Sequence, residues 1–130
     1  NTSELFVLRW NGDIENAKTE NPVELRNILL KVKGIGEETA DSILLYALKK
    51  PIFVVDAYTK RIFQRLSFIN EKQKYCEVQK FFMNNLPDDL ELFNDYHAQI
   101  VHLGNNFCNP KPGCASCILR KKAICKFQSN

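Results

Sequence analysis

Apolar residues recur at helical spacing along most of this chain, and no sustained alternation of apolar and polar residues predicts a strand. The clearest helix start is Asn21-Pro22, because Asn accepts a hydrogen bond from a free backbone N–H and Pro suits the first helical position. The apolar positions that follow are Leu25, Ile28, Leu29 and Val32. A helix from residue 22 to about residue 32 is therefore predicted.

The same spacing predicts four more helices. The second covers about residues 37–49 and is ended by Pro51, with one apolar face made of Ala40, Ile43, Leu44, Ala47 and Leu48. The third follows Asp56, and the last two cover about residues 73–84 and 90–106. The segment after residue 106 contains two prolines and a glycine, which is typical of a loop with one helical turn at most. The fold class is therefore all-α.

The pattern divides the chain into three parts. Residues 1–20 show neither period and are predicted to be an irregular N-terminal segment or the remnant of a missing half of a helical barrel. Residues 21–106 contain the helices, and residues 107–130 form a cysteine-rich tail. A length of 130 residues, of which 45% are hydrophobic, fits one folded domain. No apolar run approaches the ~18 residues of a membrane span, so we expect no membrane partner.

Charge is distributed unevenly. The net charge of +3 is too small to indicate a nucleic-acid-binding protein by itself. From residue 106 onward, however, there are five basic residues and no acidic one, whereas residues 1–105 carry a net charge of −2. The positive charge is therefore concentrated in the cysteine-rich tail.

Two glycines interrupt the apolar pattern in the segment Lys33-Gly34-Ile35-Gly36, between the first two predicted helices. Glycines two residues apart suit a tight turn with positive φ. Such a turn can direct backbone N–H groups outward at the start of a helix, where a phosphate can dock. The alternative is that the glycines only form a corner between two helices.

Asp56 lies between the apolar run of residues 52–55 and the next predicted helix. This position fixes the orientation of its carboxylate, which makes Asp56 a candidate catalytic residue. The alternative is that Asp56 only caps the helix, and the sequence does not separate the two roles.

Four cysteines fall within eighteen residues, in the pattern Cys108-x5-Cys114-x2-Cys117-x7-Cys125. With no secretory signal at the start of the chain, this density favours a metal site over disulfides. Zinc sites often use two close Cys pairs, and only Cys114 and Cys117 form one here. Iron–sulfur clusters tolerate uneven spacing, so a cluster is favoured and zinc is the alternative.

Three more residues with metal-binding side chains receive simpler interpretations. Cys76 is alone in a predicted helix and is interpreted as a small buried hydrophobic residue. His97 and His102 lie on the apolar-rich helix that leads to the cysteines, and they are interpreted as packed or surface residues.

Taken together, these motifs resemble the endonuclease III superfamily of helix-hairpin-helix DNA glycosylases. The resemblance covers roughly residues 21–126: it begins with the segment LKVKGIGEETA at residues 30–40, continues through Val54-Val55-Asp56, and closes with the four cysteines. It implies the helix-hairpin-helix glycosylase fold with a C-terminal iron–sulfur loop. It also implies base excision, in which a damaged nucleotide leaves the stack of double-stranded DNA and its glycosidic bond is cut.

The resemblance also implies residue roles. Asp56 matches the catalytic aspartate, which stabilises the developing sugar cation and orients or activates water. The cysteines match the ligands of a 4Fe-4S cluster, which braces a basic loop against DNA. The residues expected to contact the DNA backbone are Lys33, Gly34, Ile35, Gly36 and Thr39.

One position departs from the family pattern. Enzymes of the endonuclease III type that also nick DNA carry a lysine nucleophile two residues after the second hairpin glycine, whereas this chain has Glu38. A carboxylate cannot form a Schiff base, so we expect a monofunctional glycosylase without lyase activity. The residues around the hairpin and Asp56 are most similar to the branch that removes alkylated purines such as 3-methyladenine. Oxidised or mismatched bases are the alternative substrates.

Family members are longer than this chain, and most of the helical region before the hairpin has no counterpart here. We therefore expect the C-terminal part of a longer protein, which is inactive alone if the base pocket lies in the other part. The alternatives to an enzyme are a non-catalytic DNA-binding fragment and a structural protein stabilised by zinc. We expect a cytoplasmic monomer, associated with the nucleoid if the source is prokaryotic.

Overall fold

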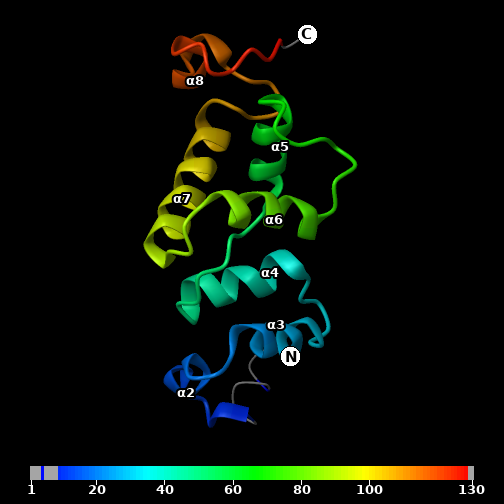
Figure 1. Ribbon diagram of the computed structural model, residues 1–130, viewed down its shortest axis with the longest axis vertical. Coiled ribbons are helices and arrows are strands. Elements are labelled where there is room, and N and C mark those ends of the chain that lie inside the picture. The colour runs from blue at the N-terminus through cyan, green and yellow to red at the C-terminus, as the bar shows by residue number, and fades with distance from the viewer. Residues whose placement is uncertain (1–3, 5–8, 129–130) are drawn as a thin grey trace. The chain divides into compact units, whose positions relative to one another are not determined.

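The computed structural model describes residue 4 and residues 9–128. The regular elements, shown in Figure 1, are α2 (Ile14–Lys18), α3 (Pro22–Leu30), α4 (Glu37–Ser42), η1 (Ile43–Ala47), α5 (Ala57–Arg65), α6 (Tyr75–Asn85), α7 (Leu90–Asn106), η2 (Cys114–Ser116) and α8 (Ile118–Lys121). No strand occurs among these described residues, so the predicted all-α fold class is confirmed. None of the described helices combines the length and the hydrophobicity that crossing a membrane requires.

The chain forms two compact units. The first contains the residues up to Val54 together with Leu86–Asn94, and the second contains Val55–Asn85 together with the residues from Asp95 onward. One boundary therefore lies between Val54 and Val55, one residue before Asp56, and another lies within α7. The glycine hairpin belongs to the first unit, whereas Asp56 and the four cysteines belong to the second.

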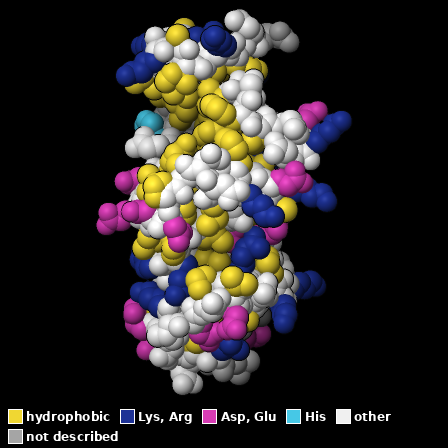
Figure 2. Space-filling model, viewed as in Figure 1, with side chains coloured by type: hydrophobic (Ala, Val, Ile, Leu, Met, Phe, Trp, Pro, Cys, Tyr) yellow, Lys and Arg dark blue, Asp and Glu magenta, His cyan; other side chains and the backbone are white. Residues whose placement is uncertain are grey.

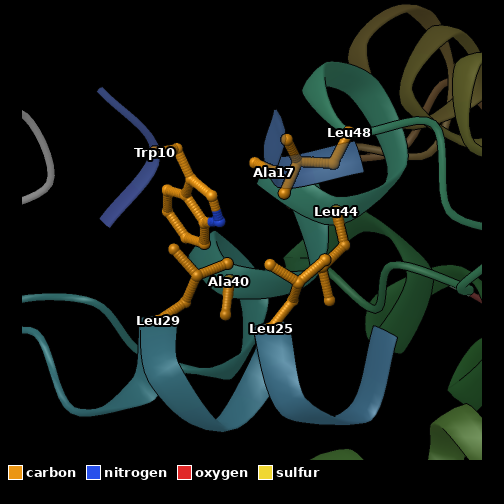
Figure 3. Close-up of a cluster of buried hydrophobic side chains, with 7 residues drawn as sticks. All are labelled: Trp10, Ala17, Leu25, Leu29, Ala40, Leu44 and Leu48. Carbon is orange, nitrogen blue, oxygen red and sulfur yellow. The ribbon is translucent and has the colours of Figure 1, made fainter. Parts of the chain in front are cut away.

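The first unit is built around an apolar cluster, drawn in Figure 3. Its buried residues are Trp10, Ala17, Leu25, Leu29, Ala40, Leu44 and Leu48. Leu25 and Leu29 are four residues apart on α3, so both side chains face the cluster. Trp10 and α2 lie in the segment for which the sequence predicted no regular structure, and the indole N–H of Trp10 donates to Glu20 Oε1 at 2.8 Å. Leu5, Phe6 and Leu8, the other apolar residues of that segment, lie outside the described residues.

The second predicted helix is not one continuous α-helix. After α4 the chain widens into the π-helix η1, in which the N–H of Leu48 donates to the carbonyl of Ile43 at 3.0 Å. The additional residue in this turn brings Leu45 into the core beside Leu44, and both are fully buried. The α-helical period placed Leu45 outside the apolar face, which is why the sequence did not predict its burial.

Aromatic rings from three helices form the core of the second unit. The ring of Phe63 on α5 meets the ring of Phe82 on α6 edge to face, with their centres 4.6 Å apart. Phe82 also packs against Tyr96 of α7, with ring centres 5.9 Å apart and nearly perpendicular planes. Edge-to-face contacts of this kind are favourable beyond the area that they bury.

A glycine lets α5 and α7 approach each other closely. A Cβ atom added to Gly104 on α7 would lie 2.3 Å from Cδ1 of Tyr58 on α5. The Tyr58 hydroxyl then donates to Asn105 Oδ1 at 2.9 Å, so that this tyrosine spans both helices. Glycine is unfavourable within a helix, and this contact is the reason for its presence in α7.

We expect Gly104→Ala to lower the free energy of unfolding by about 1–3 kcal/mol, despite the higher helix propensity of alanine, because the Tyr58 ring must move. Chemical denaturation measures the change. Gly113→Ala is the control, since a Cβ there meets no atom within 4 Å. Equal stability of Gly104→Ala and the wild type would show that the Tyr58 ring can move aside without loss of stability.

Candidate active site and cysteine pocket

Asp56 caps the N-terminus of α5. Its Oδ1 accepts hydrogen bonds from the backbone N–H of Thr59 at 2.8 Å and from the Thr59 hydroxyl at 2.9 Å. Thr59 is fully buried, and the preceding apolar residues Phe53, Val54 and Val55 are buried as well. The capping role foreseen from the sequence is therefore present, and it uses one of the two carboxylate oxygens.

The other oxygen of Asp56 is bound from α7. His97 Nε2 lies 2.8 Å from Asp56 Oδ2, and the two side chains are only 15% and 11% exposed. Because the carboxylate accepts, this hydrogen bond assigns the proton to Nε2 of the imidazole. From the sequence, His97 was a possible additional metal ligand but was interpreted as a packed or surface residue. Its pairing with Asp56 was not predicted, because the two residues are 41 positions apart in the chain. His102, in contrast, is exposed, as expected for a surface histidine.

The surroundings of Asp56 keep its carboxyl group ionised. Burial raises the pKa of Asp56, but the hydrogen bonds from His97 and from the N–H and hydroxyl of Thr59 lower it, so the pKa lies below its ordinary value. A negative charge is thus held in a poorly solvated position, where it acts more strongly on a developing positive charge than it would in water.

The two hairpin glycines adopt different conformations. Gly34 has a φ of +91°, a left-handed conformation that favours glycine. Gly36 has extended backbone at the N-terminus of α4, and a Cβ there would meet no atom within 4 Å. The expectation of positive φ therefore holds for Gly34 and is wrong for Gly36. The hairpin residues Lys33, Gly36 and Thr39 are exposed, as is Glu38. Ile35 is partly buried and packs against the apolar cluster.

A buried ion pair joins the two helices of the hairpin. Asp41 on α4 is fully buried, and its Oδ1 and Oδ2 accept from Nε and Nη2 of Arg26 on α3 at 2.7 and 3.2 Å. A planar guanidinium that meets a carboxylate through two bonds fixes the orientation of both groups. The pair therefore holds α3 and α4 at the angle that shapes the Lys33–Gly36 turn.

All four cysteines of the tail line one pocket in the second unit. The remaining wall is mostly apolar, with contributions from Ile62, Leu66, Leu103, Phe107, Pro112, Leu119 and Phe127. Arg120 also lines the pocket, and its Nε atom is buried without a hydrogen-bond partner among the described residues. The pocket therefore offers thiol ligands and one buried N–H donor of a guanidinium to an occupant.

Zinc and an iron–sulfur cluster make different demands on the positions of the thiols. A single zinc requires four ligands about 2.0–2.3 Å from one centre. The cysteines of an iron–sulfur cluster bind separate iron atoms. Within the described residues, no three Cys, His, Asp or Glu side chains converge closely enough to hold one metal ion.

Two arginines of α5 bind the start of the cysteine segment. Arg61 Nε donates to the Cys108 carbonyl at 2.8 Å, and Arg65 Nη1 donates to the Asn109 carbonyl at 2.8 Å and approaches Cys108 Sγ at 3.3 Å. The guanidinium of Arg65 also lies over the Phe127 ring, 4.8 Å from its centre. The sequence contained no signal for these contacts, which connect residues more than 40 positions apart.

At the top of the view in Figure 2, Lys and Arg side chains are visible without Asp or Glu among them, in agreement with the local positive charge of the sequence.

The fifth cysteine corrects an expectation. Cys76 is exposed on α6 and is not a buried hydrophobic residue, because the core positions of this helix are taken by Val78 and Phe82.

Comparison with known proteins identifies relatives. A Methanocaldococcus jannaschii protein, whose name assigns it to the DNA repair glycosylases, is 47% identical over 127 residues, which are 97% of this chain and 58% of that protein. Endonuclease III of Sulfolobus acidocaldarius is 32% identical over 80% of this chain and 45% of its own length. A thymine/uracil-DNA glycosylase of Pyrobaculum aerophilum is 28% identical over 96% of this chain and 53% of its own length. No protein-family model matches the chain.

A solved structure supports the same relationship. A trapped covalent intermediate of endonuclease III with DNA, an estranged-adenine complex, matches 95% of this chain and 53% of the solved chain, with a TM-score of 0.74 and 26% identity. This match confirms the helix-hairpin-helix glycosylase fold. The chain spans about half the length of the curated relatives it matches.

Proposed function

We propose that the protein removes damaged bases from double-stranded DNA by hydrolysing the N-glycosidic bond, since the chain is similar in sequence and in fold to DNA glycosylases and endonuclease III. The observation that carries this proposal is the ionised carboxylate of Asp56, which is held through both oxygens in a poorly solvated position. The relatives are named for glycosylase or endonuclease III activity, which supports the reaction class.

In this reaction the bond between the anomeric carbon and the base nitrogen breaks, and its electron pair leaves with the base. Positive charge develops on the sugar, where the fixed negative charge of Asp56 would stabilise it. A water molecule then adds to the anomeric carbon, and the carboxylate would orient it or accept its proton. Oδ1 accepts two hydrogen bonds from Thr59, whereas Oδ2 accepts one from His97 and keeps a lone pair, so these roles would fall to Oδ2.

The hairpin is proposed to bind the DNA backbone through Lys33, Gly34, Ile35, Gly36 and Thr39. Gly36 supports this role, because neither its backbone conformation nor its packing requires a glycine. A glycine that the fold of the chain does not itself require suits the close approach of another backbone, such as that of a DNA strand. Lys33 is exposed beside the turn and would add the positive charge that a phosphate requires.

We further propose that the enzyme is monofunctional. Glu38 occupies the position of the lysine nucleophile, and its carboxylate cannot form a Schiff base with an opened sugar. The hairpin and Asp56 motifs suggest alkylated purines as substrates. The relatives described above are named for other activities, so oxidised, deaminated and mismatched bases are equal candidates in the test.

The cysteine pocket is proposed to hold a 4Fe-4S cluster through Cys108, Cys114, Cys117 and Cys125. When bound, the cluster supplies structural bracing of the basic C-terminal segment and no chemistry at the glycosidic bond. Arg61 and Arg65 already hold the start of this segment by its carbonyl groups. The basic residues of this C-terminal segment would then face DNA in one fixed arrangement.

A panel of duplexes with alkylated, oxidised, deaminated or mismatched bases tests the proposed activity. We expect release of at least one base by the wild type, and a loss of about 10²–10³-fold in the single-turnover rate for Asp56→Asn, because its charge is removed and its shape is kept. Borohydride should trap no covalent complex. Trapping would refute the monofunctional mechanism, and lesion-independent binding without release would favour a DNA-binding module.

Lys33→Gln should weaken DNA binding uniformly across sequences and lower the slope of log K against log salt by about one, because one phosphate contact is lost. Fluorescence anisotropy over a range of salt concentrations measures both quantities. Lys72→Gln is the matched control, since Lys72 is also exposed but lies far from the hairpin in sequence. Identical slopes for the two variants would exclude a phosphate contact at Lys33.

Elemental analysis of the purified protein should find about four iron atoms and four sulfides per chain, with a brown colour, as expected for a cluster bound by four thiolates. Cys117→Ser should abolish iron binding, because Cys117 is the most buried of the four thiols. Cys76→Ser is the control and should keep the full iron content. A colourless preparation that contains one zinc would support the structural alternative.

A further inference from the structure

Asp56 has a second binding partner that helix capping does not explain. A cap requires one side-chain oxygen, and Thr59 already supplies both of its donors to Oδ1. The hydrogen bond from His97 reaches Oδ2 from a different helix, at 2.8 Å, within the same compact unit. The pair is also mostly withdrawn from solvent, since the side chains of His97 and Asp56 are only 15% and 11% exposed.

We propose that His97 is a positioning residue for the catalytic carboxylate, which it holds in one rotational state about the Cβ–Cγ bond while Thr59 holds the other oxygen. The inference rests on the proposed function of Asp56. Rotation about that bond moves both oxygens, and the two Thr59 donors restrain it only at Oδ1. The His97 bond adds a restraint at Oδ2 from a second helix, which narrows the rotation and therefore the direction in which the free lone pair of Oδ2 faces.

The electrostatics of the site support this assignment. Burial raises the pKa of Asp56, so every donor that binds the charged form contributes to keeping it ionised. His97 lowers the pKa of Asp56 both through its hydrogen bond and through Coulombic attraction, so it favours the charged carboxylate in two ways.

The first test measures the carboxyl group itself and needs no substrate. The titration of the Asp56 side-chain carbon is followed by ¹³C NMR in the wild type, in His97→Gln and in His97→Leu. The glutamine amide can still donate to Oδ2, whereas leucine fills the space without a donor. We expect the pKa of Asp56 to rise in His97→Leu and to stay near the wild-type value in His97→Gln. The same titration in all three proteins would refute the proposal.

The second test separates positioning from DNA binding. We expect His97→Leu to lower the single-turnover excision rate about 10-fold or more, the value of one hydrogen bond to a charged group, with DNA affinity unchanged within about 2-fold. His97→Gln should recover most of the rate, which a role in packing alone would not produce. A His97→Leu rate equal to or above that of the wild type would refute the proposal, because the hydrogen bond from His97 would then not assist Asp56 in the reaction.

A replacement variant and a comparison with Asp56→Asn separate a failure to fold, and a failure of the proposed function, from a failure of this proposal. If His97→Leu does not fold by circular dichroism, His97→Asn replaces it, because its shorter amide does not reach Oδ2. If the wild type and Asp56→Asn release base equally, the proposed function fails, and the NMR titration still decides whether His97 controls the charge of Asp56.

Discussion

The two oxygens of the Asp56 carboxylate bind different helices, and the geometry of the second unit depends on this division. Oδ1 satisfies the donors of Thr59 at the start of α5, and Oδ2 binds His97 on α7. One side chain thus connects two helices that also meet at the close contact of Gly104 with Tyr58. A carboxylate that is hydrogen-bonded at both oxygens cannot turn freely. Its charge is therefore already in position when an opposite charge develops beside it, and no reorganisation is needed at that moment.

Helix α5 extends this constraint to the cysteine segment. It begins after Asp56, and Arg61 and Arg65 on its later turns bind the carbonyl groups of Cys108 and Asn109. Nine residues of helix span about 13 Å, so one rigid element relates the carboxylate to the cysteine pocket. A cofactor in that pocket would therefore influence the site by holding α5 in place, and it would not need to touch the reacting atoms.

The sequence predicted those features that depend on neighbours along the chain. Asn21 and Asp56 cap their helices as their residue types suggest, and α7 has the predicted bounds because its apolar spacing is regular. The pairs His97 with Asp56 and Arg26 with Asp41 were not predictable, since each depends on how separate helices pack. Only the packing of α3 against α4 shows that Asp41 is buried. The π-helical turn was missed because it departs from the α-helical period on which the prediction of that helix rested.

The chemistry of the proposed reaction places an unusual demand on the departing base. In the proposed monofunctional reaction no amine attacks the sugar, so no Schiff-base intermediate would divide the barrier into two smaller steps. The negative charge of Asp56 would then stabilise the sugar cation, and a contribution of about 3–4 kcal/mol is typical of one such group. The remaining stabilisation would come from the ease with which the base leaves and from the binding of the extruded nucleotide. A base that carries positive charge, or that gains a proton as it departs, lowers the barrier on its own side of the breaking bond. Substrate choice in the proposed reaction is therefore a question of leaving-group chemistry as much as of the shape of a pocket.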